Sequence, residues 1–305
     1  MKLPTFLIIG VQKAGTTSIY GYLTEHPQVY MSPRKETNFF CVDREKKPEE
    51  NRERKPWMGN KTRIDTWEKY CELFIDVKDE IAVGEASPNY LVRYQISSEM
   101  IKNYLPDVKM IAILRNPVDR AYSDYLMHLR DGINAGKLRS LSEQVKFHSE
   151  TSSTIKKGLY YTPIKHYFDT FGQEKLKIFL YDDLTKDSVK MMQEIYRFIG
   201  VDDTFNPDTS KRKQSAAVPK NQTLNNLLQT RNPIRTAISS TLKLAMSLEM
   251  RQKLRSGLVN LNSGGKELQP LSSEERQLLT DFYREDILKL QDLIQRDLSS
   301  WLIIE

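Results

Sequence analysis

Cysteine, histidine and long apolar runs are scarce in this 305-residue chain. The two cysteines, Cys41 and Cys71, cannot form a disulfide framework, and we expect both to stay reduced thiols. Neither they nor the four scattered histidines have the spacing of a zinc site. No apolar run approaches the roughly 20 residues that cross a bilayer, and the N-terminus does not resemble a signal peptide. The sequence therefore predicts a soluble, cytoplasmic protein that holds no metal.

The composition is that of a globular protein, with 39% hydrophobic and 28% charged residues, which excludes disordered, collagen-like and coiled-coil chains. The net charge of +6 is concentrated in one segment. Residues 211–255 hold ten Lys or Arg and one Glu, a net charge of +9, which leaves −3 for the rest of the chain. Such a concentration usually faces an anion, namely a nucleotide, a polyanionic substrate or an acidic membrane. The alternative is a pair of solvated basic helices.

Short apolar runs alternate with helical spacing over the first two thirds of the chain. We expect strands at residues 6–10, 29–31, 81–84, 108–114 and 176–181, and helices at residues 16–23, 117–132, 162–171, 189–199 and 272–298. Residues 43–63 are charged and irregular, which indicates a long surface loop. The alternation predicts an α/β fold with a mostly parallel sheet and helices on both faces. We expect one domain over residues 1–305, with an α/β core at 5–200 and a helical part at 205–305.

The most informative stretch is the turn Gly10-Val-Gln-Lys-Ala-Gly-Thr-Thr-Ser18 between the first strand and the first helix. A glycine-rich turn here lets backbone N–H groups and the helix dipole close around a phosphate. Lys13 adds a positive charge, and the residues after Gly15 add hydroxyl donors. In nucleoside triphosphatases the lysine follows the second glycine, whereas Lys13 precedes Gly15, and no later strand offers a clear magnesium-binding Asp. The alternative is a turn that uses glycine for structural reasons only.

This turn resembles the phosphosulfate-binding loop of sulfotransferases that use 3′-phosphoadenosine 5′-phosphosulfate (PAPS), and the resemblance implies a P-loop-like fold. It also implies donor-binding roles for six consecutive residues: Lys13, Ala14, Gly15, Thr16, Thr17 and Ser18. A second motif, Leu114 to Tyr125, places Arg115 at a strand end and Ser123 two turns into the next helix. In this family the matching Arg and Ser bind the 3′-phosphate, and a guanidinium with a hydroxyl is a suitable anion clamp.

Further motifs extend the resemblance over residues 5–302. Tyr181, in Phe179-Leu-Tyr-Asp-Asp-Leu184 after the Lys157-Gly-Leu-Tyr-Tyr161 motif, is expected to pack on adenine, with a buried strand-end tyrosine as the alternative. The segment Arg34-Lys-Glu-Thr-Asn-Phe-Phe40 resembles the heparan sulfate sulfotransferases and their bacterial relatives, which implies that Glu36 is the catalytic base.

Glu36 has one alternative role, and the sequence differs from known sulfotransferase patterns at two places. Glu36 could instead be a loop residue paired with Arg34 or Lys35. Cytosolic small-molecule sulfotransferases use a histidine in the region that matches Gly84 to Tyr90, where this chain has none. The heparan-type pattern usually carries a lysine where Ala86 stands, so a glycosaminoglycan contact from that lysine is not expected here.

The tail from Leu271 is similar to the closing helix of bacterial and heparan-type members, with Phe282, Leu290 and Ile294 expected in its core. The 3′ side of the donor is expected to be closed by Lys220, or by the Lys211-Arg212-Lys213 group. In residues 231–255, apolar side chains recur at helical spacing with basic residues around them. This pattern fits either a helix on an anionic membrane or one packed on the domain.

The resemblance implies transfer of a sulfuryl group from PAPS to a hydroxyl or amine of a glycan, glycolipid or small metabolite. Lys13 would neutralise charge on the leaving oxygen and Glu36 would take the acceptor's proton, without a metal. Two alternatives remain open: a nucleotide- or polyanion-binding module, and a small-molecule kinase of similar fold. No nucleic-acid-binding motif is present, so we expect no nucleic-acid partner.

Substituting Lys13→Ala is expected to abolish turnover and to weaken PAPS binding, because the ammonium is the charge placed within the turn. Calorimetric titration with the nucleotide and transfer of labelled sulfate measure the two effects. Turnover at the wild-type rate would remove this turn from the mechanism.

Overall fold

The computed structural model describes residues 2–42, 64–131, 138–210 and 271–304, with the single residues 250 and 257. They fall into two compact units. The first comprises the described parts of Met1–Asn116, Leu159–Lys213 and Asp286–Leu298. The second comprises the described parts of Pro117–Gly158, Gln214–Glu285 and Ser299–Glu305. The expected division into 5–200 and 205–305 stays a prediction.

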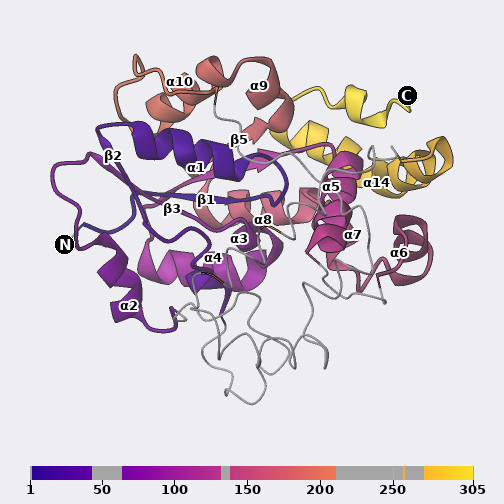
Figure 1. The fold of residues 1–305 in the computed structure, drawn as a ribbon, viewed down its shortest axis with the longest axis horizontal. Helices are drawn as coiled ribbons and strands as arrows, with labels where there is room; N and C mark the ends of the chain where they lie inside the picture. Colours follow the sequence, from indigo (N-terminus) through magenta and orange to yellow (C-terminus); the bar gives the residue numbers. More distant parts are fainter. Residues whose placement is uncertain are drawn as a thin grey trace. The chain divides into compact units, whose positions relative to one another are not determined.

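A five-stranded parallel sheet forms the centre of the first unit, as predicted (Figure 1). Its strands run in the order β2-β3-β1-β4-β5 and comprise β1 (Phe6–Gly10), β2 (Val29–Met31), β3 (Ala82–Ala86), β4 (Lys109–Leu114) and β5 (Leu176–Leu180). Strands β1 and β3 are buried along their whole length, because helices cover both faces of the sheet. The last strand is one residue shorter than predicted, since Tyr181 begins the next helix.

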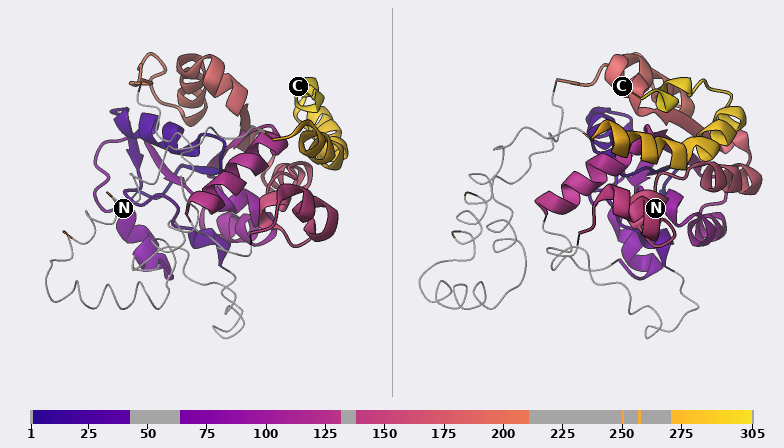
Figure 2. Two further views of the ribbon diagram at one scale, coloured as in Figure 1. Left: turned by 45° about the vertical axis from the view of Figure 1, so that its right-hand side comes forward. Right: turned by 90° about the vertical axis from the view of Figure 1, so that its right-hand side faces the viewer.

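Helices of the first unit lie on both sides of the sheet (Figures 1 and 2). On one side are α1 (Thr16–Glu25), α9 (Tyr181–Lys186) and α10 (Ser188–Ile199). On the other are α3 (Asn89–Val92), α4 (Tyr94–Tyr104) and α8 (Tyr161–Phe171). The short elements are α2 (Trp67–Cys71), η1 (Phe39–Cys41), η2 (Glu72–Phe74) and η3 (Gln173–Lys175). Because all five strands are parallel, their carboxyl ends lie at one edge of the sheet.

The described part of the second unit contains α5 (Pro117–Arg130), α6 (Leu141–His148), α7 (Ser153–Lys156) and η4 (Ser299–Leu302). The long helix α14 (Ser273–Ile294) contributes residues to both units. Its buried side chains recur at helical spacing and are Leu279, Tyr283, Ile287 and Leu290. The predicted core positions Phe282 and Ile294 are only half-buried, because Phe282 flanks this stripe and Ile294 is the last residue of the helix.

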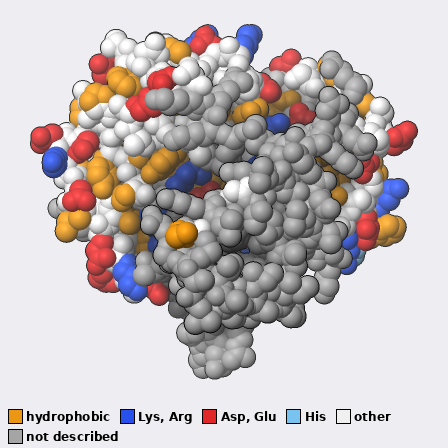
Figure 3. Space-filling view, in the orientation of Figure 1, with side chains coloured by type: hydrophobic (Ala, Val, Ile, Leu, Met, Phe, Trp, Pro, Cys, Tyr) orange, Lys and Arg blue, Asp and Glu red, His pale blue; other side chains and the backbone are white. Residues whose placement is uncertain are grey.

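Both cysteines are buried and free, in agreement with the expected reduced thiols. Among the described residues, no helix combines the length and the apolar character that crossing a membrane requires. Acidic and basic side chains are interspersed on the described surface in Figure 3. The predicted basic segment 211–255 and the loop 43–63 lie outside the described residues, apart from Met250.

Gly84 in β3 is the position where the sheet leaves least room for a side chain. A Cβ there would overlap the ring of Phe6 and lie 2.6 Å from the sulfur of Met31. We expect Gly84→Ala to lower the free energy of unfolding by roughly 1–3 kcal/mol through overpacking. Gly21, inside α1, is the matched control, because a Cβ there meets nothing within 4 Å.

Substituting Gly21→Ala is expected to stabilise the protein by roughly 0.5–1 kcal/mol, since alanine restricts the unfolded chain more than glycine does. Chemical denaturation of the two variants and the wild type measures both effects. Equal stability of the two variants would contradict the packing described for β3.

Candidate active site

The turn after β1 leads into α1 and contains two residues with left-handed backbone. Gly15 adopts φ = +86° and Lys13 φ = +73°, both in the left-handed region. The turn is tied to the sheet by a hydrogen bond from the amide of Val11 to the carbonyl of Ile113, 2.9 Å long. Gly15 is the N-cap of α1, and no side chain caps that helix end. The positive end of the helix dipole therefore faces the turn.

Four of the predicted donor-binding residues come together around this turn. Arg115 directly follows β4, and its Nη1 donates to the carbonyl of Lys13 at 3.1 Å. Its guanidinium lies over the ring of Tyr181, 4.7 Å from the ring centroid. A Cβ on Gly15 would lie 3.3 Å from that ring and overlap Leu184, so only glycine fits this close approach. The result is a cationic, aromatic-lined cradle at the start of α1.

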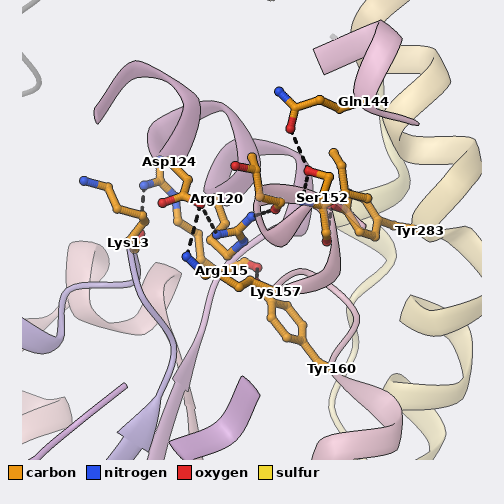
Figure 4. Close-up of polar contacts among 11 residues, drawn as sticks. Lys13, Arg115, Arg120, Asp124, Gln144, Ser152, Lys157, Tyr160 and Tyr283 are labelled. Atoms are coloured by element: carbon orange, nitrogen blue, oxygen red, sulfur yellow. Dashed lines mark hydrogen bonds and ion pairs between the residues drawn. The ribbon is translucent and has the colours of Figure 1, made fainter. Parts of the chain in front are cut away.

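Tyr160, to which no motif assigns a role, supports this cradle through the backbone of Arg115. Its hydroxyl donates to the carbonyl of Arg115 at 2.9 Å (Figure 4). Its amide donates to Asp286 Oδ2 at 2.7 Å, and the amide of Tyr161 donates to the same carboxylate. Asp286 thus caps the start of α8, where no local side chain does so. The Lys157–Tyr161 motif was the available signal, although it does not reveal this bond.

Glu36 lies in the loop after β2, and its backbone is in the left-handed region at φ = +60°. Its amide donates to the carbonyl of Ala86 at 2.8 Å, which fixes the loop to the end of β3. The carboxylate is 28% exposed and pairs with Lys35, whose Nζ lies 2.9 Å from Oε1. This is the pairing that the sequence left open as an alternative to a catalytic role. Because both partners are partly exposed, it is a weak interaction that leaves the carboxylate accessible.

A second carboxylate, which the sequence analysis overlooked, lies beside this loop. Glu85 in β3 is fully buried and accepts hydrogen bonds from Ser87, from Tyr90 at 2.8 Å and from Thr37 at 3.2 Å. Burial raises the pKa of Glu85 to about 7, against the lowering effect of those hydrogen bonds. The signal in the sequence was an acidic residue inside an otherwise apolar strand.

Ser123 belongs to the second unit, where it lies half-buried on α5. The next residue, Asp124, is fully buried between two cations, Arg120 at 3.5 Å and Lys157 at 3.6 Å. Arg120 also donates to the carbonyl of Thr154, which joins α5 to α7 (Figure 4). This buried cluster fixes the segment of α5 that carries Ser123. The joint action of Ser123 with Arg115 stays a prediction, and Lys220 lies outside the described residues.

Comparison with known proteins agrees with the motifs and with this geometry. Residues 3–262 match the family described as sulfotransferase domain. The chain belongs to the sulfotransferase family. Human bifunctional heparan sulfate N-deacetylase/N-sulfotransferase 3 is 25% identical over 99% of this chain and 31% of its own length. Mouse heparan sulfate glucosamine 3-O-sulfotransferase 6 is 28% identical over 56% of this chain and 47% of its own length.

A solved structure gives a match over the whole chain. The crystal structure of a sulfotransferase from Alicyclobacillus acidocaldarius is 28% identical, covers 99% of both chains and superimposes with a TM-score of 0.68. This sulfotransferase chain spans less than half the length of the two curated relatives named above. The predicted resemblance and the P-loop-like α/β fold are confirmed, and sulfuryl transfer is the chemistry of this family.

No cluster of three or more His, Cys, Asp or Glu side chains suited to a metal occurs in the part of the chain that the structure describes. The scheme without a metal stays a prediction.

Asp124 offers a direct test of the buried cluster. Replacing it by asparagine removes the negative charge between Arg120 and Lys157, both of which are buried. We expect Asp124→Asn to cost roughly 3–5 kcal/mol of stability, because two buried cations lose their counter-ion. Asp119 on the same helix is the control, since its pair with Arg276 is part-exposed at 37% and 25%.

The control variant Asp119→Asn is expected to cost no more than about 1 kcal/mol. Urea unfolding of both variants at neutral pH measures the difference. Similar losses at the two positions would show that the cluster around Asp124 contributes nothing beyond a surface ion pair.

Proposed function

We propose that this sulfotransferase transfers the sulfuryl group of PAPS to a hydroxyl or amine of a glycan acceptor. The observation that carries the proposal is the convergence of Lys13, Gly15, Arg115 and Tyr181 at the carboxyl ends of β1, β4 and β5. A turn at the start of a helix suits an anionic adenine nucleotide when a guanidinium and an aromatic ring line it and position 15 has room only for glycine.

On the donor side, each residue has a separate task. Lys13 and the loop residues 14–18 hold the phosphosulfate, and Lys13 neutralises the charge that develops on the leaving oxygen. Arg115 binds the 3′-phosphate, the role that the family resemblance also assigns to Ser123. Tyr181 contacts adenine, while its ring and the Lys13 carbonyl keep the guanidinium in place. PAPS supplies the sulfuryl group and leaves as adenosine 3′,5′-bisphosphate (PAP).

On the acceptor side, Glu36 accepts the proton that the attacking hydroxyl or amine loses. Its partial exposure lets an acceptor reach the carboxylate, and Lys35 lies beside it as an ion-pair partner. The nucleophile then forms the new bond to sulfur as the bond from sulfur to the phosphate oxygen breaks. In-line positioning of these two groups is the main requirement of such a transfer.

A glycan is the acceptor class that the relatives favour, because the names of two of them specify heparan sulfate or its glucosamine. A glucosamine-containing oligosaccharide, which offers both an amine and hydroxyls, is therefore the first probe. Glycolipids and small metabolites are the other acceptors that the sequence allows. A cytoplasmic location and membrane contact through residues 231–255 stay predictions.

The proposal is tested by the transfer of labelled sulfate from PAPS to a glucosamine oligosaccharide, with wild type and Glu36→Gln compared. We expect Glu36→Gln to lower kcat by roughly 100-fold, since general base catalysis contributes about that much. Its affinity for PAP is expected to stay within about twofold, since Glu36 faces the acceptor. The control is Glu72→Gln, an exposed glutamate in η2.

Two outcomes would contradict the proposal. Unchanged kcat in Glu36→Gln would require another base, with His128 the next residue to substitute. Firm binding of ATP with no response to PAPS or PAP would instead favour the kinase alternative.

A further inference from the structure

The turn that carries Glu36 has an unfavourable backbone. Glu36 and Asn38 adopt φ values of +60° and +52°, and neither is glycine. Left-handed residues of this kind cost roughly 1 kcal/mol or more each, so the surrounding structure has to impose them. No helix or strand includes residues 33–38. Contacts with the end of β3 therefore have to impose this backbone conformation.

Three consecutive residues of the turn are held by the end of β3. The amide of Glu36 donates to the carbonyl of Ala86 at 2.8 Å. The backbone and hydroxyl of Thr37 donate to the carboxylate of Glu85. The amide of Asn38 donates to Ser87 Oγ at 3.0 Å, and Ser87 in turn donates to Glu85. Glu85 is the acceptor on which two of these three attachments depend.

The carboxylate of Glu85 is fixed in turn by a helix on the face of the sheet. Tyr90 in α3 is fully buried, and its hydroxyl donates to Glu85 Oε2 at 2.8 Å. The same hydroxyl lies 3.1 Å from the hydroxyl of Thr37. The network therefore ties the strand, the helix and the turn together, and it has two attachments to Thr37.

A buried carboxylate is a costly way to hold a loop, because ionised groups lose their hydration when they leave water. Glutamate is rarely fully buried unless it is paired with a cation, so Glu85 calls for an explanation beyond the packing of the strand. Two of its hydrogen bonds come from Thr37, the residue after the proposed base.

We propose that Glu85 is a positioning residue for catalysis, which acts through Thr37 to hold Glu36 in its left-handed turn with the carboxylate toward the acceptor. This inference rests on the proposed function of Glu36. Glu85 itself is 0% exposed, so it does not touch the acceptor. Burial, together with the charge of Glu85, raises the pKa of Tyr20, Tyr70 and Tyr90. Their hydroxyls are therefore neutral at physiological pH. A hydroxyl can donate to either oxygen of a carboxylate. In an amide it can donate only to the oxygen, because the nitrogen is itself a donor.

The first test measures the turn without an acceptor. Hydrogen exchange of the wild type, Glu85→Gln, Tyr90→Phe and Tyr30→Phe is compared in peptides that cover residues 33–41. Tyr30→Phe is the matched control, because its hydroxyl donates to the carbonyl of Leu73 outside this network. We expect the amides of residues 36–38 to exchange at least tenfold faster in Glu85→Gln and Tyr90→Phe, with no change in the control. Unchanged exchange in both network variants would overturn the inference.

The second test separates positioning from folding. With PAPS and the glucosamine oligosaccharide, Glu85→Gln is expected to lower kcat by about 10- to 100-fold, as loss of a supporting residue does. Its Kd for PAP is expected to stay within twofold, because the donor cradle is built from other residues. A parallel loss of kcat and of PAP affinity would mean that Glu85 merely holds the fold together, and would overturn the inference.

The double variant Glu36→Gln/Glu85→Gln decides whether Glu85 acts through Glu36. If it does, the double variant is no slower than Glu36→Gln alone, because the group that Glu85 positions is already gone. Multiplied losses would overturn the inference. A wild type that transfers no sulfate from PAPS would contradict the proposed function instead, and the exchange test of the turn would still give its own answer.

Discussion

The candidate site depends on hydrogen bonds that tie each functional loop to the end of a neighbouring parallel strand. The turn after β1 is held by β4 through Val11 and the carbonyl of Ile113. The segment after β3 is held by β1 through Ser87 and the carbonyl of Ile8. Since the strand order places β1 between β3 and β4, these attachments bring the loops to one edge of the sheet. The order of the strands, which no local motif encodes, therefore determines which side chains meet.

Function and stability make opposite demands at Glu85. Its pKa is raised from 4.5 to about 7 in the folded protein, so folding favours the protonated form. The stabilisation that comes with protonation is present at acidic pH and is lost as the pH rises through about 7. The ionised carboxylate therefore opposes folding in the pH range where it best accepts hydrogen bonds from Thr37 and Tyr90. A residue retained at such a cost is typical of functional sites.

The sequence predicted the sheet, and it singled out the residues that meet around the turn after β1, because both follow from local signals. Apolar runs ending at glycine or arginine marked β1 and β4, and the Lys13–Gly15 spacing distinguished the turn from that of nucleoside triphosphatases. Tyr160 and Glu85 were missed, because their roles depend on contacts with residues far away in the chain. The hydroxyl of Tyr160 reaches Arg115, 45 positions earlier, and Glu85 reaches Thr37, 48 positions earlier. Periodicity and motifs contain no information about such pairs.

The two carboxylates next to the turn differ in environment, and this difference separates their tasks. Glu36 is partly exposed and its pair with Lys35 is worth at most about 1 kcal/mol, so an acceptor can displace the lysine at little cost. Glu85 is buried and held by three side chains, so it cannot move to meet a substrate. A base has to be reachable, whereas the group that positions it has to be fixed. The exposure of Glu36 and the burial of Glu85 meet these two requirements in segments that are far apart in the sequence and adjacent in the structure.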